Sequence, residues 1–201
     1  MSEDFEGLFL IRGAGATGSN GGSCCSILTS FGRFAAHAAI EYAKNAEPLE
    51  SIDLSVAESE FSRLEELRTR KIEGGLRPHV IRHHIQEACG TCLGILRPQD
   101  KLEAALVELK RIRDEEIPKM IVTSDTKTFN TEWKEAIENY NLLDAAILAV
   151  AATLERKELR GAYLRPEYPE RDDENFNCML LAKLTDGEPV FTKRDLPQAQ
   201  L

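Results

Sequence analysis

Hydrophobic residues recur three and four positions apart through the middle of the chain, which is the spacing of amphipathic helices. Four segments show this pattern, and they cover residues 54–68, 79–94, 98–118 and 130–154. Short loops that contain glycine or proline separate them. Antiparallel helices joined by short loops pack as an up-down bundle, so the sequence predicts a bundle of three or four helices.

The first and last of these helices carry end signals. A capping box at Ser55 and Glu58 opens the first helix. Its predicted apolar stripe consists of Leu54, Ala57, Phe61, Leu64 and Arg68. At the start of the last helix, the side chain of Asn130 or Thr131 can accept a hydrogen bond from a first-turn amide. Phe129 stands at the position of a hydrophobic staple.

The first part of the chain has a different pattern. A short apolar run at residues 7–11 is typical of a buried strand, and a glycine-rich stretch follows at residues 13–30. Residues 31–43 return to helical spacing, with small side chains that permit close packing. The pattern predicts a strand, a glycine loop and a helix. A lone strand also needs a sheet to join.

The last part changes again. Residues 160–175 are densely charged, yet Tyr168 lies among the charges and Phe176 follows them, so we expect this tract to be ordered against another surface. Further on, apolar residues flank Asp186-Gly187, a dipeptide that favours a tight turn between two strands. The predicted fold is therefore mainly α: a strand–glycine loop–helix, an up-down helical bundle and a small C-terminal β-hairpin.

Composition argues against some classes of function. The 201 residues carry 25 Lys and Arg against 34 Asp and Glu, a formal charge of −9. This acidic balance argues against nucleic-acid binding, which needs a dense basic surface. No run approaches the ~20 apolar residues of a membrane span. An acidic N-terminus is unlike a signal peptide, and cysteines in such a chain read as reduced thiols, so we expect a cytoplasmic protein.

Two motifs suggest chemistry but lack its structural context. Residues 13–18 match a G-x-G-x-x-G phosphate loop, yet the predicted bundle follows where a dinucleotide fold needs further parallel strands. Cys89 and Cys92 form a C-x-x-C pair late in a helix, whereas a thioredoxin-like site follows a strand. We interpret the pair as core thiols, with a thiol redox protein as the alternative. No metal site is predicted.

Several segments resemble one family, in the same order along the chain. Residues 158–165, with Arg160-Gly161-Ala162, and residues 168–176, with Arg171-Asp172-Asp173-Glu174, resemble the C-terminal signature of succinate dehydrogenase/fumarate reductase flavoproteins. That family also includes L-aspartate oxidase and adenylylsulfate reductase. Residues 129–133 are similar to the family as well. Residues 7–9 and 21–33 resemble its last flavin-domain block.

This resemblance implies the C-terminal part of an FAD-dependent oxidoreductase. The family's ADP-binding domain and capping domain have no counterpart in these residues, so we expect a partner flavoprotein chain to carry the N-terminal FAD domain and to share the FAD. The family's backbone contacts to the flavin fall here on Gly22, Ser23, Cys24 and Cys25. A helix N-terminus beside the flavin would stabilise the reduced ring. An iron–sulfur electron-transfer subunit is a further candidate partner.

Two departures from the family pattern affect the expected substrate and cofactor. Before the double glycine, Thr17 stands where succinate and fumarate enzymes have a histidine, and their arginine is missing. Because that arginine clamps a substrate carboxylate, we expect a substrate other than succinate or fumarate. The family's Gly-Glu appears here as Arg12-Gly13, so FAD would be held differently.

The expected domains are residues 1–46, a C-terminal piece of an FAD-binding domain; residues 52–158, the helical bundle; and residues 159–201, a charged loop with the hairpin. The leading hypothesis is a separately encoded C-terminal subunit that is inactive alone and completes the flavin site of its partner. The alternative is a non-catalytic binding or assembly module of a flavoprotein complex. A fragment of a longer flavoprotein would have the same sequence.

Overall fold

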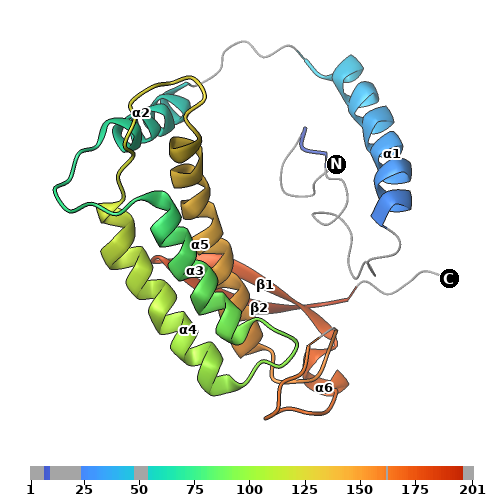
Figure 1. Cartoon of the computed structure of the whole chain (residues 1–201). Helices are drawn as coiled ribbons and strands as arrows, with labels where there is room; N and C mark the ends of the chain where they lie inside the picture. The colour runs from blue at the N-terminus through green and yellow to red at the C-terminus, as the bar shows by residue number, and fades with distance from the viewer. Residues whose placement is uncertain (1–6, 10–23, 48–53, 162, 197–201) are drawn as a thin grey trace. The chain divides into compact units, whose positions relative to one another are not determined.

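The computed structural model describes residues 7–9, 24–47, 54–161 and 163–196, with the backbone alone for residues 24–31. Contacts divide the chain into two compact units, Met1–Leu54 and Ser55–Leu201. The first unit contains α1 (Cys24–Asn45), drawn in blue in Figure 1. The ring of Phe9 meets that of Tyr42 edge-on, with centroids 5.9 Å apart. None of the described side chains of this unit is buried.

The helix predicted over residues 31–43 is confirmed and is longer than expected, since it begins at Cys24. The strand predicted at residues 7–11 lies partly outside the described residues. The glycine-rich segment before Cys24 lies outside them as well.

The second unit is the predicted bundle. Helices α3 (Pro78–Cys92), α4 (Gln99–Arg111) and α5 (Thr131–Glu155) each pack against the other two. They run alternately down and up, as Figure 1 shows. Helix α2 (Ser55–Thr69) lies near the beginning of α5 and contacts it. No helix in the described ranges is both long enough and apolar enough to cross a membrane.

The core lies between α3, α4 and α5, where the three apolar faces meet. Its fully buried side chains include Ile81, Ile85, Leu102, Leu109, Leu143 and Val150. One polar residue, Asn139, is buried with them. Its Nδ2 donates to the carbonyl oxygen of Pro78 at 2.7 Å, and its Oδ1 accepts from Nε of Arg82 at 3.3 Å. These bonds offset the cost of burying an amide.

Helix α2 is confirmed, but the first part of its predicted apolar stripe is not buried. The exposed members of that stripe are Leu54, Ala57 and Phe61. Leu64 is half-buried, and the buried residues of α2 are Leu67 and Arg68, of which Arg68 belongs to the predicted stripe. The contact between α2 and α5 lies toward this end of α2, where Nε1 of Trp133 in α5 donates to the Leu64 carbonyl at 3.1 Å. Only the C-terminal half of α2 therefore packs on the bundle.

The start of α5 confirms one end signal and corrects another. Asn130 is the N-cap, and its Oδ1 accepts from the Trp133 amide at 2.9 Å. Its Nδ2 donates to the carbonyls of Ser124 and Thr126 and ties the preceding loop to the helix. Phe129 then falls at a corner with φ of +56° and is 96% exposed. The predicted hydrophobic staple does not form.

The segment predicted as one helix from Pro98 to Pro118 has three parts. Pro98 is the N-cap of α4 rather than a residue of its first turn. After Arg111 the chain widens into a π-helical turn, η3 (Ile112–Glu116), and then tightens into a 3₁₀ turn, η4 (Ile117–Lys119). The π-helical turn matters below, because it directs Glu116 toward α3 and Arg113 toward the hairpin.

The C-terminal hairpin is confirmed. Strands β1 (Cys178–Thr185) and β2 (Glu188–Asp195) pair antiparallel and pack against α5. Asp186 and Gly187 both have positive φ, +51° and +79°. Two such residues form the type I′ turn that matches strand twist, which explains the Asp-Gly dipeptide. A one-turn helix, α6 (Asp173–Phe176), precedes β1.

Candidate functional site

The predicted flavin contacts fall at the start of α1. Gly22 and Ser23 lie outside the described residues. Cys24 and Cys25 are the first two residues of α1, described by their backbone alone. The first amides of a helix have no carbonyl partner within it and carry partial positive charge. No acidic side chain occupies the first turn of α1 to neutralise that charge. This arrangement suits an electron-rich flavin ring.

The C-x-x-C pair lies at the end of α3, where its geometry favours a core role. Cys92 is the last residue of α3 and is fully buried, and Cys89 is half-buried. Burial raises the pKa of both thiols above the usual range. A raised pKa disfavours the thiolate, the reactive form. The two cysteines therefore act as packing residues, as the sequence indicated. Within the described residues, no group of side chains could hold a metal ion.

His83 and His84 point to different faces of α3, as adjacent helical residues do. Nδ1 of His84 lies 2.8 Å from Oε2 of Glu116 in the π-helical turn, and Arg111 donates to the other oxygen of Glu116 at 2.5 Å. Burial alone would raise the pKa of Glu116, but the hydrogen bonds from His84 and Arg111 outweigh burial and lower it. His83 instead faces solvent beside Glu87. The His84–Glu116 contact joins α3 to the end of α4.

The charged tract after α5 is ordered around Glu158, which is 0% exposed. Arg160 donates to both carboxylate oxygens, at 2.6 and 3.0 Å. Arg156 donates at 2.5 Å and the amide of Asp172 at 3.0 Å. Burial pushes the pKa of Glu158 up, but the hydrogen bonds from Arg160, Asp172 and Arg156 hold it below its ordinary value. The carboxylate thus stays charged, and its hydrogen bonds hold the segment around Arg160 against the segment around Asp172.

A second buried charge, Arg165, sits at the C-terminal end of α5. Its Nη1 donates to the carbonyls of Thr153 and Arg156, at 2.5 and 3.2 Å. A cation there complements the negative end of the helix dipole. Two residues further on, Glu167 accepts a 2.9 Å bond from the amide of Gln99, at the positive end of α4. The tract therefore places a cation at the negative end of α5 and a carboxylate at the positive end of α4.

The same tract also holds the hairpin and the loop between α3 and α4. Arg156 donates to the carbonyls of Phe176 and Cys178, which fixes the start of β1. On the other side, the amide of Leu164 donates to the Ile95 carbonyl at 2.7 Å. The expectation that the charged tract packs on a surface is therefore met. That surface is the end of its own bundle.

These buried charges have little signature in the sequence. Glu158 and Arg165 belong to a tract of Asp, Glu and Arg that composition alone assigns to solvent. The available signal was the placing of Tyr168 and Phe176 among them, because aromatic rings seldom stay in water without a packing partner. The rings of Tyr168 and Phe176 do lie beside Arg165 and Arg156, respectively.

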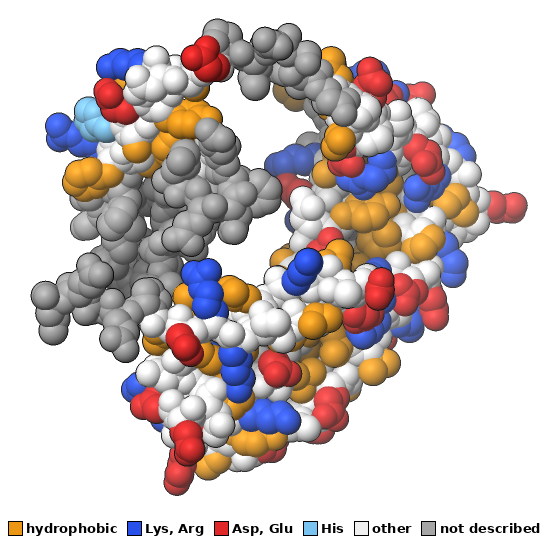
Figure 2. Space-filling view, turned by 180° about the vertical axis from the view of Figure 1, so that it is seen from behind, with side chains coloured by type: hydrophobic (Ala, Val, Ile, Leu, Met, Phe, Trp, Pro, Cys, Tyr) orange, Lys and Arg blue, Asp and Glu red, His pale blue; other side chains and the backbone are white. Residues whose placement is uncertain are grey.

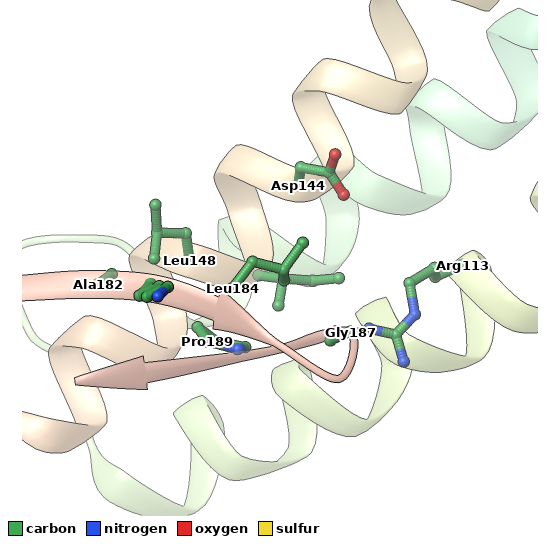
Figure 3. A pocket seen from close by; sticks show the side chains of 9 residues that line it. Arg113, Asp144, Leu148, Ala182, Leu184, Gly187 and Pro189 are labelled. Carbon is green, nitrogen blue, oxygen red and sulfur yellow. Dashed lines mark hydrogen bonds between the residues drawn. The ribbon is translucent and has the colours of Figure 1, made fainter. Parts of the chain in front are cut away.

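A small cleft lies between α5 and the hairpin. Its volume is about 250 Å³. Figure 3 shows Asp144 and Leu148 on the α5 side, Leu184 and Pro189 on the hairpin side, and Arg113 at one end. Arg113 reaches it from the π-helical turn and donates to the Gly187 carbonyl at 3.3 Å. The cleft is thus mainly apolar, with charged groups at its rim.

Solved structures share this architecture. A FrdA chain of E. coli quinol fumarate reductase superposes with a TM-score of 0.80 and 27% identity, over 89% of this chain and 31% of that one. An adenylylsulfate reductase of Archaeoglobus fulgidus has a TM-score of 0.70 at 23% identity, over 88% and 30%, which shows a shared fold. The helical bundle and the hairpin therefore have the fold of a domain found in these reductase chains.

Sequence comparison identifies the family. The family model described as fumarate reductase flavoprotein C-term matches residues 82–201, and the chain belongs to this family. The fumarate reductase flavoprotein subunit of Mycobacterium tuberculosis is 35% identical over 88% of this chain and 30% of its own length. The corresponding values for the succinate dehydrogenase flavoprotein subunit of Rickettsia conorii are 29%, 90% and 29%. The chain spans about three tenths of these relatives.

Proposed function

We propose that this chain is the C-terminal subunit of a split FAD-dependent oxidoreductase of the succinate dehydrogenase/fumarate reductase type. In this proposal a partner flavoprotein chain binds the ADP half of FAD, and the present chain completes the site around the flavin ring. One observation carries it: none of the described side chains of the first unit is buried, whereas the bundle has a core of its own. The remaining functions of the whole enzyme would come from the partner.

Within this proposal the three regions have separate tasks. Residues 1–46 complete the FAD-binding domain, residues 52–158 form the bundle, and residues 159–201 form the tail. Bound FAD would supply hydride chemistry. Gly22, Ser23, Cys24 and Cys25 would approach the ring with their backbone, and small side chains there leave room for it. The start of α1 would then stabilise negative charge on the reduced flavin.

The proposed substrate is neither succinate nor fumarate. Thr17 replaces the histidine of those enzymes and their carboxylate-binding arginine is missing, although these positions lie outside the described residues. Without a bidentate cation, a dicarboxylate loses its main anchor. We also propose a cytoplasmic location, with an iron–sulfur subunit as a candidate electron-transfer partner.

Co-expression with the open reading frame adjacent to this gene tests the proposal, which predicts that this frame encodes the N-terminal FAD domain. We expect a yellow complex that contains both chains and loses its flavin on Cys24→Trp, because a bulky side chain would block the backbone approach. Ala43→Trp, near the far end of α1, is the matched control and should keep the flavin. A colourless chain that never associates with the flavoprotein would refute the proposal.

The missing arginine favours a second candidate, a non-catalytic assembly module that retains the bundle. This candidate predicts a complex whose flavin spectrum is indifferent to substitutions at Cys24 and Cys25. The same pair of tryptophan variants therefore separates the two proposals.

A further inference from the structure

The C-terminal hairpin is attached to the bundle differently at its two ends. At its base, Arg156 donates to the carbonyl oxygens of Phe176 and Cys178, at 3.0 and 2.9 Å. The Phe176 side chain is buried, and Arg156 is also paired with the fully buried carboxylate of Glu158. The base of the hairpin therefore belongs to the buried network at the end of α5.

The tip of the hairpin, residues 184–189, is held by charges near the surface. Nζ of Lys110, in the last turn of α4, lies 2.7 Å from Oε2 of Glu188. From the π-helical turn, Arg113 donates to the other oxygen of Glu188 at 3.2 Å and to the Gly187 carbonyl at 3.3 Å. The three charged side chains are 31–43% exposed. We call these three contacts the tip latch.

The tip latch differs from most surface ion pairs of this chain in what it connects. Basic and acidic side chains are interspersed over the face that Figure 2 shows. Many of the pairs join neighbours on one helix, such as Glu60 and Arg63 in α2. The tip latch instead joins β2 to α4 and to the π-helical turn, which directs Arg113 toward the hairpin. Its state therefore affects how two distant elements are arranged.

Beneath the tip the packing is incomplete. Leu184 and Pro189 line one side of the cleft of about 250 Å³, and Leu148 of α5 lies on the other side (Figure 3). Leu184 is 73% exposed, so its side chain is not part of a core. Exposed ion pairs contribute little free energy, and salt screens them. The tip should therefore separate from α5 much more readily than the base.

We propose that the hairpin is a strap hinged at its base, and that opening and closing of the tip latch widens and narrows the cleft beside α5. In the closed state Glu188 holds the tip to Lys110 and Arg113. In the open state the base stays fixed while the tip moves away from α5, and salt favours this state because it screens the latch charges. This inference concerns the second unit alone and does not depend on the proposed function.

Methyl relaxation-dispersion NMR on the full chain with labelled leucines tests the strap, because Leu148 and Leu184 report the two sides of the cleft. We expect a minor state in the wild type, and Glu188→Gln should raise its population about threefold, the effect of losing an exposed ion pair. Asp186→Asn is the matched control. It removes a carboxylate from the same turn that makes no ion pair with a described residue, and Asn tolerates the positive φ there. It should leave the population unchanged.

Salt and a second variant complete the test. High salt should raise the minor population in the wild type but not in Glu188→Gln, and adding Lys110→Gln to Glu188→Gln should have no further effect. Circular dichroism establishes that each variant is folded. The proposal is overturned if Leu184 shows no exchange in the wild type or in Glu188→Gln, or if Asp186→Asn acts like Glu188→Gln. Equal exchange at Leu180, near the base of β1, would also overturn it, because the whole hairpin would then detach.

Discussion

The two units of this chain differ in how far their side chains are buried. In Ser55–Leu201, apolar faces of three helices meet and their central side chains are fully buried. In Met1–Leu54, α1 is 22 residues long, yet no described side chain of the unit is buried and Phe34 is 70% exposed. The bundle has a core of its own, whereas the described part of the first unit has none. This difference is what the proposed function predicts for a segment that completes a partner's FAD-binding domain.

The largest expected effect lies in the tail of the bundle unit. Glu158→Gln removes the charge that Arg156 and Arg160 share, and leaves both guanidinium groups without their buried partner. Breaking a buried ion pair in this way costs about 3 to 5 kcal/mol of unfolding free energy. Urea denaturation measures it, with exposed Glu174→Gln as the control. Equal stability of the two variants would show that the tail adds nothing to the bundle.

A core substitution should separate the two units directly. Leu109→Ala in α4 leaves a cavity among fully buried side chains, at an expected cost of about 2 to 5 kcal/mol. Ile40→Ala in α1 removes an exposed side chain and should change the unfolding free energy of the isolated chain by about 0.5 kcal/mol or less. Comparable losses for both would mean that α1 has a core after all.

Helix ends offer a smaller version of the same comparison. Asn130→Ala removes the N-cap bond to the Trp133 amide and should cost about 1 kcal/mol. In α1, Asn45 donates only an exposed bond to the Glu41 carbonyl, so Asn45→Ala should change the isolated chain by a few tenths of a kcal/mol. Thermal unfolding followed by circular dichroism checks both. A larger loss of unfolding free energy for Asn45→Ala than for Asn130→Ala would contradict the view that the bundle provides most of the stability.

The smallest expected difference concerns pH, because many carboxyls titrate together. The folded state lowers the pKa of Glu158, so its stabilisation is complete above the ordinary value of about 4.3 and is lost as pH falls through the lower folded value. Unfolding free energy should therefore decline more steeply with acid in the wild type than in Glu158→Gln. Parallel curves between pH 5 and pH 3 would contradict this assignment.

Much of the bundle could be predicted from the sequence, because periodicity reports burial directly. Leu143, Ile147 and Val150 share one helical face and all lie in the core. Asn130 and Asp186-Gly187 were recognisable because each satisfies a local backbone requirement. These signals depend only on neighbouring residues.

The features that were missed depend on distant partners. Phe61 has the right spacing for a stripe, yet its side chain is 67% exposed. By its local sequence Glu158 is a surface charge, whereas in the structure it is buried and accepts a hydrogen bond from the amide of Asp172, 14 residues further on. The proposed flavin contacts of Gly22 and Ser23 lie outside the described residues, so they stay a prediction from family resemblance.

Hydrogen exchange of α1, measured in the chain alone and in the complex with the flavoprotein, tests the central claim most directly. A helix with few buried contacts opens easily, whereas a packed helix is protected. The amides of Cys24–Asn45 should exchange rapidly in the chain alone and become strongly protected in the flavin-containing complex, while α3 and α5 are protected in both. Protection of α1 that is the same with and without the flavoprotein would contradict the claim that this segment completes its partner's domain.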